Sequence, residues 1–173
     1  MNYLTRLVAF IMAIVLFIFT PITARANSLS YIAPEEVDGI PEEIKEIAEI
    51  VGNEFNICPE LLEAIAYYES RYTADATNGS CRGLMQINTN VHQERFINMG
   101  WSAKEWDDPY KNTYVAADYL AELFTEYEDV AYVLYLYNGD TTNAKRYKQN
   151  GYLSAYVSRI LTKSEELERL HGK

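Results

Sequence analysis

Apolar residues recur at helical spacing along most of the chain, which predicts a mostly α-helical fold. Pro41 and the two glutamates after it open the first such segment, residues 41–51, and both features are typical of a helix N-terminus. Pro59 opens the second segment, residues 59–70. A later segment with apolar residues on one face begins at Asn112, and further helices are predicted over residues 130–137, 142–149 and 152–170.

Three intervals between these segments lack helical spacing. Residues 71–82 are rich in Asp, Asn, Gly and Ser and are expected to form a loop. Residues 83–88 fit a short strand or a turn, and residues 89–110 are expected to be loop with room for a short helix. The β-branched and aromatic run 130–137 is compatible with a strand, but Asp129 is a suitable N-cap, so we predict a helix there.

Glu69 lies where the second helix should bury a hydrophobe. Leu61, Leu62 and Ile65 form one apolar stripe, and position 69 continues it, four residues after Ile65. Loss of water at such a position favours the protonated carboxyl, which can act as a general acid near neutral pH. The alternative is that the helix frays one residue earlier and that Glu69 points to solvent.

The N-terminal segment 1–26 has the features of a cleaved signal peptide. Arg6 precedes thirteen uninterrupted apolar residues, and Ala24-Arg25-Ala26 is an A-x-A cleavage pattern. An uncleaved anchor is the alternative, although thirteen apolar residues are few for a membrane span. Either way we expect export to the extracellular space, cell wall or periplasm. Cleavage would leave residues 27–40 as a tether before one domain, residues 41–173, without stable membrane insertion.

The charge of the chain argues against several classes of partner. The whole sequence has a formal net charge of −10, and loss of the leader, which contains two arginines and no acids, makes it −12. So acidic a protein is not expected to bind nucleic acid or to dock electrostatically on anionic lipid. Any anionic polymer would have to be recognised by local contacts.

Cysteines and histidines do not predict a metal or a cofactor. Cys58 and Cys81 are the only cysteines, and an even number in an exported chain predicts one disulfide, with two buried thiols as the alternative. His92 and His171 have no metal-ligand spacing and are expected at the surface. Neither histidine is near a candidate Ser or Cys nucleophile in the sequence.

Four short motifs occur in the order found in lytic transglycosylases of the soluble (SLT) type. Together they cover roughly residues 41–160, and their order and spacing make the resemblance specific. They are Pro59 to Ile65 with Glu69-Ser70, which resembles the family's helix and Glu-Ser motif; Gly83-Leu84-Met85-Gln86-Ile87, which resembles Gly-Leu-Met-Gln; Asp108-Pro109 with Asn112 and Tyr119-Leu120; and Tyr137-Asn138-Gly139, which resembles Tyr-Asn-x-Gly.

The resemblance implies a lysozyme-like helical domain with a glycan-binding groove over residues 41–173. It implies cleavage of the β-1,4 bond between N-acetylmuramic acid (MurNAc) and N-acetylglucosamine (GlcNAc) in peptidoglycan strands, with Glu69 as acid and base and 1,6-anhydroMurNAc as product. That scheme needs one carboxyl, and the nearest second one, Asp75, is interpreted as a loop-forming residue. The alternatives are a lysozyme-type muramidase that uses water and a non-catalytic glycan-binding protein of a secretion apparatus.

Matching positions imply roles for further residues. Gln86 and Asn88 would line the groove and bind sugar, or would only satisfy turn backbone. Tyr137 would place its hydroxyl near the catalytic carboxyl or the scissile bond, or would be a core tyrosine. Asn138 would bond to backbone or sugar, and Ser70 would hold the end of the catalytic helix or the reacting sugar.

The chain departs from the family pattern at several positions. Gly139 follows Asn138 directly, where the family usually has a small residue between Asn and Gly, and Asn88 stands where many members carry Met. Cys58 and Cys81 lie outside the pattern, just before the catalytic helix and just before the Gly-Leu-Met-Gln motif. A disulfide between them would clamp both walls of the site.

Overall fold

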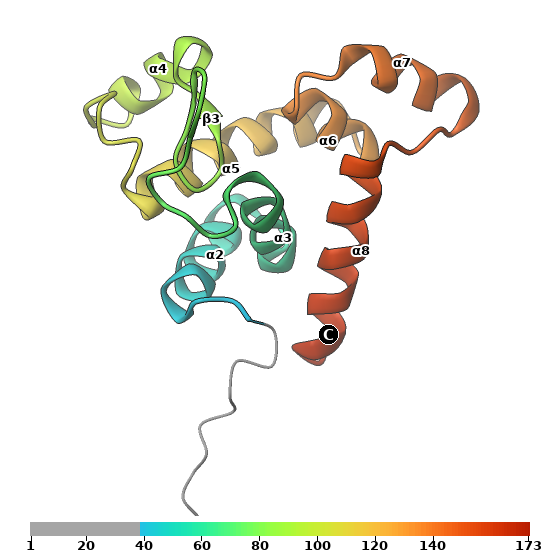
Figure 1. The fold of residues 1–173 in the computed structure, drawn as a ribbon, viewed down its shortest axis with the longest axis horizontal. Helices are drawn as coiled ribbons and strands as arrows, with labels where there is room; N and C mark the ends of the chain where they lie inside the picture. Colours follow the sequence, from blue (N-terminus) through green and yellow to red (C-terminus); the bar gives the residue numbers. More distant parts are fainter. Residues whose placement is uncertain (1–38) are drawn as a thin grey trace, which may run out of the picture. The chain divides into compact units, whose positions relative to one another are not determined.

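A computed structural model describes residues 39–173, and the statements below refer to that part of the chain. The predicted signal peptide (1–26) and nearly all of the predicted tether (27–40) lie outside the described residues. The described part is mostly helical, with one very small sheet (Figure 1). The helices are α2 (Glu42–Phe55), α3 (Pro59–Ser70), α4 (Thr89–Asn98), α5 (Pro109–Glu126), α6 (Val130–Tyr137), α7 (Thr141–Asn150) and α8 (Ala155–Leu170).

Helix starts follow local capping signals. The Asp129 side chain accepts a hydrogen bond from the Tyr132 N–H, which confirms a helix over 130–137. Asp108 caps α5 in the same way, with Pro109 in the first turn, so this helix begins three residues before the predicted Asn112. Ser154 caps α8 through the Val157 N–H, three residues into the segment predicted to be helical.

The intervals predicted as loops contain more structure than expected. Residues 71–88 form a three-stranded antiparallel sheet of two-residue strands, β1 (Thr77–Asn78), β2 (Cys81–Arg82) and β3 (Ile87–Asn88). In its register Asn78 faces Cys81, and Cys81 faces Asn88. The short helix that the sequence allowed within residues 89–110 is α4, which occupies the first ten of those residues.

Helix α3 lies at the centre of the domain. It packs against α2 and α8, and α2 packs in turn on α5 (Figure 1). The apolar stripe predicted for this helix is buried, with Leu62 and Ile65 almost fully removed from solvent. Ile40, the last residue of the predicted tether, is also buried in this core. A central, buried helix gives the residue at its end a fixed position.

The start of α3 is joined to the end of α8 by a buried carboxylate. Glu60 is 1% exposed, and its carboxylate accepts hydrogen bonds from Lys173 Nζ at 2.7 Å and from Cys58 Sγ at 3.0 Å, with His171 Nδ1 at 2.9 Å. Burial alone would raise the pKa of Glu60, but these bonds lower it to about 2. Glu60 is therefore charged and fully paired at neutral pH.

The predicted disulfide between Cys58 and Cys81 is not formed, and both cysteines are free. Cys58 is the N-cap of α3, whereas Cys81 lies beside Glu69 at the other end of that helix. At 1.5 Å of rise per residue, the ends of α3 are about 16 Å apart, well beyond the reach of a disulfide. An even number of cysteines does not say how far apart the fold places them.

Among helices within residues 39–173, none combines the length and the apolar character that a membrane span requires.

Candidate active site

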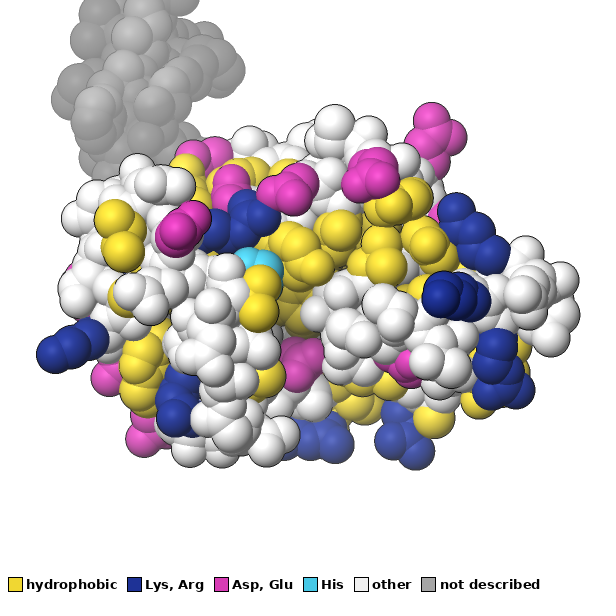
Figure 2. Space-filling model, turned by 90° about the horizontal axis from the view of Figure 1, so that it is seen from above, with side chains coloured by type: hydrophobic (Ala, Val, Ile, Leu, Met, Phe, Trp, Pro, Cys, Tyr) yellow, Lys and Arg dark blue, Asp and Glu magenta, His cyan; other side chains and the backbone are white. Residues whose placement is uncertain are grey.

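Strands β2 and β3, the start of α4, the middle of α5 and the ends of α3 and α6 surround a hollow of about 280 Å³. Figure 2 shows it as a depression with an apolar floor. Five of the residues predicted for the site from the sequence line it, although they come from three separate segments. The lining residues are Glu69, Cys81, Gln86, Ile87, Asn88, Val91, His92, Tyr119, Leu136, Tyr137, Asn138 and Gly139.

Glu69 is the only carboxylate among these lining residues. It lies in the last turn of α3, which continues to Ser70, so the helix does not fray before it. Burial raises the pKa of the Glu69 carboxyl above its usual range. Its place at the negative end of the helix dipole acts in the same direction. The sequence prediction of a poorly hydrated carboxyl therefore agrees with the geometry.

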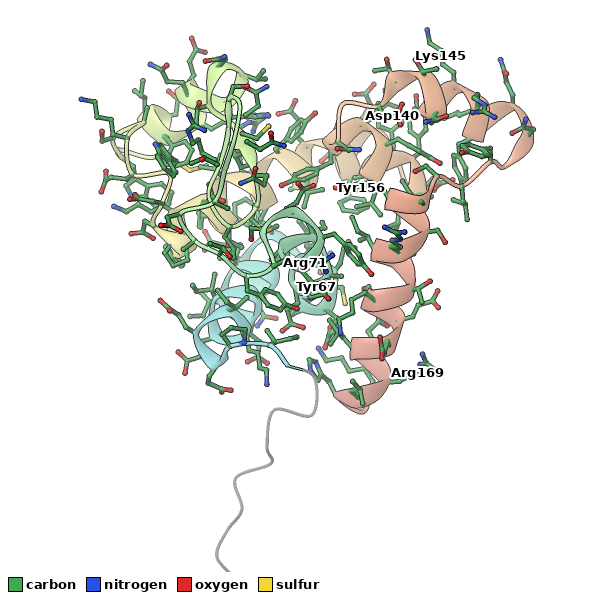
Figure 3. All side chains as sticks on the ribbon, viewed as in Figure 1. Tyr67, Arg71, Asp140, Lys145, Tyr156 and Arg169 are labelled. Carbon is green, nitrogen blue, oxygen red and sulfur yellow. The ribbon has the colours of Figure 1, made fainter. Side chains whose placement is uncertain are left out.

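Tyr156, in the first turn of α8, is the hydrogen-bond partner of Glu69. Tyr156 lies at the top of α8 in Figure 3. Its hydroxyl donates to Glu69 Oε1 at 2.5 Å, and this bond opposes the effect of burial by lowering the pKa of the carboxyl. Burial and the Glu69 charge raise the pKa of Tyr156 far above the ordinary value, so the phenol stays protonated. Tyr156 thus fixes one carboxyl oxygen and leaves the other for a ligand.

The turn carrying the Gly-Leu-Met-Gln motif is held by one buried amide. Asn112, on α5, accepts a hydrogen bond from the Met85 N–H at 2.7 Å and donates to the Arg82 carbonyl at 3.0 Å. Gly83 packs so closely that a Cβ there would lie 2.3 Å from the Trp106 carbonyl oxygen and from the Asn112 amide nitrogen. Its φ of +79° also favours glycine. The motif glycine is therefore a packing requirement.

Gln86 and Asn88 line the hollow but direct polar atoms to the backbone. Gln86 Nε2 donates to the carbonyls of Ala76 at 3.0 Å and Gly83 at 2.9 Å. Its backbone φ of +47° is unusual for a residue other than glycine, and these two bonds hold it there. Asn88 is the N-cap of α4 and accepts from the Asn90 N–H. Both residues thus shape the wall that their side chains also line.

Tyr137 and Asn138 form the opposite wall at the end of α6. The Tyr137 hydroxyl donates to the Met85 carbonyl at 2.8 Å, so it joins α6 to the motif turn instead of bonding to Glu69. Its ring stacks on Tyr119 at 5.9 Å. Burial and the nearby Glu69 carboxylate raise the pKa of Tyr137 well above its usual value. Asn138 is exposed at the C-cap of α6.

Of Ser70 and the two cysteines, only Cys81 lines the hollow. Ser70 Oγ donates to the Ala66 carbonyl and accepts from the Thr73 N–H, so it holds the end of α3 and does not line the hollow. Cys81 lines the hollow, and burial together with the Glu69 carboxylate raises the pKa of its thiol. Cys58 lies at the other end of α3 and takes no part in the site.

His92 is buried and lines the hollow, which corrects the expectation that it lies at the surface. Its ring packs at a tilt against that of Tyr119, with the ring centres 4.5 Å apart, and it accepts a hydrogen bond from Arg95 Nε. Burial and the Arg95 charge lower the pKa of its imidazole, so His92 is neutral at pH 7. Among residues 39–173, no group of three or more His, Cys, Asp and Glu side chains could hold a metal ion.

The comparisons with known proteins agree with this geometry. A family model described as the transglycosylase SLT domain matches residues 46–157. The chain belongs to the transglycosylase SLT domain family. Two curated relatives of this SLT domain, both X polypeptides of Escherichia coli and one from strain K12, are each 30% identical over 118 residues. Each alignment covers 65% of this chain and 68% of the relative.

A solved structure shows the fold of the SLT domain independently. Lytic transglycosylase Slt from Pseudomonas aeruginosa, solved as an inactive mutant, matches with a TM-score of 0.63 at 16% identity. The match covers 73% of this chain but only 24% of the Slt chain, so the SLT domain here corresponds to about a quarter of that protein. The lysozyme-like, mostly helical fold expected from the motifs is confirmed.

Proposed function

We propose that this SLT domain is a peptidoglycan lytic transglycosylase that cleaves the β-1,4 bond between MurNAc and GlcNAc. One observation carries the proposal: Glu69 is the only carboxylate lining the hollow, and burial keeps its pKa raised. A protonated carboxyl is what a general acid needs at the pH of its reaction. Membership of the SLT transglycosylase family supports the same substrate class.

The proposed reaction uses the Glu69 carboxyl twice. Glu69 first donates its proton to the glycosidic oxygen, the bond from MurNAc C1 to that oxygen breaks, and GlcNAc leaves with a free hydroxyl. The Glu69 carboxylate then takes the proton of the MurNAc 6-hydroxyl, and the oxygen of that hydroxyl bonds to C1 of the same sugar. This step restores the protonated carboxyl, consumes no water and leaves a 1,6-anhydro ring.

The single carboxylate favours this scheme over hydrolysis. Hydrolases that retain or invert configuration use a second carboxylate, as nucleophile or to activate water. Asp75, the nearest candidate in sequence, is exposed in the loop before β1 and does not line the hollow. The 6-hydroxyl is already attached to the substrate, so its attack avoids the entropy of recruiting a water molecule.

Mass spectrometry of digested peptidoglycan tests the proposal. Muropeptides should end in 1,6-anhydroMurNAc, lighter by one water than hydrolytic products, and Asp75→Asn should give the same products at a similar rate. Reducing MurNAc ends, together with loss of activity in Asp75→Asn, would establish a muramidase instead. No cleavage by the refolded or exported protein would favour a non-catalytic glycan-binding role.

We also propose export by the segment 1–26, which lies outside the described residues. A peptidoglycan substrate requires an exported enzyme, and the A-x-A pattern at residues 24–26 supports cleavage after Ala26. N-terminal sequencing of the secreted protein should begin at Asn27. Recovery of the intact N-terminus from membranes would instead support an anchor.

A further inference from the structure

Basic side chains are concentrated in one part of this acidic protein. The chain has 25 Asp and Glu against 15 Lys and Arg, yet no acid occurs between Thr141 and Ser164. That segment, which comprises α7 and the first part of α8, contains Lys145, Arg146, Lys148, Arg159 and Lys163. In the view of Figure 2, acids gather along the upper edge and bases mainly along the right and lower edges. We call the five basic residues of this segment, together with Arg71, the basic wall.

Four of the six cations of the basic wall, Arg71, Arg146, Lys148 and Lys163, lie over aromatic rings. Arg146 lies 4.1 Å from the centre of the Tyr152 ring, and Lys148 lies 4.0 Å from that of Tyr132. Within residues 39–173, the one ion pair of the basic wall joins Lys163 Nζ to Glu166 at 4.0 Å. Arg95, by contrast, is paired with two carboxylates of α5. The basic wall thus keeps positive charge available to a ligand.

Two cations of the basic wall flank the end of the helix that carries Glu69. The Arg71 guanidinium lies 4.1 Å from the Tyr67 ring centre, and Lys163 Nζ lies 5.7 Å from the same ring (Figure 3). Arg71 is the left-handed C-cap of α3, with a φ of 56°, so its backbone is fixed two residues after Glu69. Residues from α3 and α8 therefore place two positive charges beside one ring in the last turn of the helix that carries Glu69.

None of the six residues of the basic wall lines the hollow, but α7 and α8, which carry five of them, both begin beside it. Gly139 lines the hollow, and the next residue, Asp140, is the N-cap of α7. At the start of α8, Tyr156 bonds to Glu69. Lys145 projects from the upper side of α7 in Figure 3, which is the side seen in Figure 2. A polymer that extends from the hollow past the starts of α7 and α8 would meet these cations.

We infer that the basic wall binds the carboxylates of the peptide stems of peptidoglycan, so that stem-bearing strands are the preferred substrate. The inference rests on the proposed function, because a glycan strand in the hollow is what brings its stems to the wall. The lactyl group of each MurNAc carries a peptide with free carboxylates. Since the whole protein repels anions at long range, local arginine and lysine contacts must recognise these groups.

The experiment compares two forms of the same glycan strands, both freed of wall phosphate polymers. One form keeps its peptide stems, and an amidase has removed the stems from the other. The wild-type kcat/KM should be higher on stem-bearing strands, and Arg71→Gln with Lys163→Gln should lower it about three- to tenfold on those strands alone. High salt should have the same selective effect. Lys104→Gln, an exposed lysine before α5, is the control and should change neither rate.

Each other outcome has a distinct meaning. Equal losses on both forms would overturn the stem contact and leave the proposed function intact. A loss seen only on walls that retain phosphate polymers would replace the carboxylates with phosphates and also overturn the inference. If the wild type cleaves neither form, the proposed function fails. Binding of both forms to Glu69→Gln then tests the stem contact without turnover, and equal affinities would refute it.

Discussion

Removal of the Tyr156 hydroxyl should change the acidity of Glu69 without changing the shape of the site. Tyr156→Phe keeps the ring and deletes the bond to Glu69 Oε1, which is 2.5 Å long. That bond stabilises the charged carboxylate, so its loss raises the pKa of Glu69 beyond the value that burial already sets. The descending limb of the pH–rate profile should therefore move to higher pH.

The size of this shift follows from the strength of such a bond. A hydrogen bond to a charged group contributes about 1.5–3 kcal/mol, and one pKa unit corresponds to about 1.4 kcal/mol. The pKa of Glu69 should then rise by about one to two units. The same substitution should lower kcat, because the carboxyl loses the contact that fixes its orientation.

The assay is the pH dependence of kcat/KM on purified peptidoglycan strands, supported by an NMR titration of the labelled Glu69 carboxyl. Tyr137→Phe is the matched control, since its hydroxyl bonds to the Met85 carbonyl and not to Glu69. Tyr137→Phe should lose some stability, but the descending limb of its pH–rate profile should stay at the wild-type pH. A limb that stays in place in Tyr156→Phe, or that moves to lower pH, would refute the assigned role of the bond.

Four further substitutions test separate parts of the structure. Glu69→Gln should abolish turnover. Because the raised pKa means that the charged carboxyl costs stability at neutral pH, it should leave Tm unchanged or higher, an advantage that disappears below about pH 4. Gly83→Ala should destabilise the domain by at least about 2 kcal/mol, measured by urea unfolding, because of the 2.3 Å contact. Gly79→Ala, which meets no atom within 4 Å at a φ of +62°, should cost only about 1 kcal/mol. Glu60→Gln should cost about 2 kcal/mol at pH 7. Since its pKa is lowered to about 2, this difference should shrink as pH falls from the ordinary carboxyl value toward 2.

Sequence patterns predicted those helices whose signals are local. Helix α3 has Pro59 at its start and a continuous apolar stripe, and α6 has an aspartate cap, so tertiary contacts were not needed to find them. The bounds of α4 could not be predicted, because only His92 and Phe96 are buried along its length, too few to form a stripe. Two-residue strands contain no alternation that a sequence could display.

Those residues of the site that belong to family motifs could be predicted from the sequence, and the others could not. Glu69, Gln86 and Tyr137 come from three motifs, and all line the hollow. Tyr156 could not be found, because its contact with Glu69 spans 87 residues and nothing in the local pattern distinguishes one tyrosine among 15. The buried position of His92 likewise depends on packing between α4 and α5 that spacing does not encode.

The last helix is attached to α3 by a carboxylate at each end. Tyr156, at the start of α8, bonds to the acid that closes α3, while Lys173, just after α8, pairs with Glu60 at the beginning of α3. The protonation of the reacting group therefore depends on whether α8 is docked. Partial detachment of this one helix would stop catalysis while the remaining core stays folded. On heating, loss of activity should precede global unfolding and coincide with faster hydrogen exchange in α8, which makes enzymatic rate a readout of local opening.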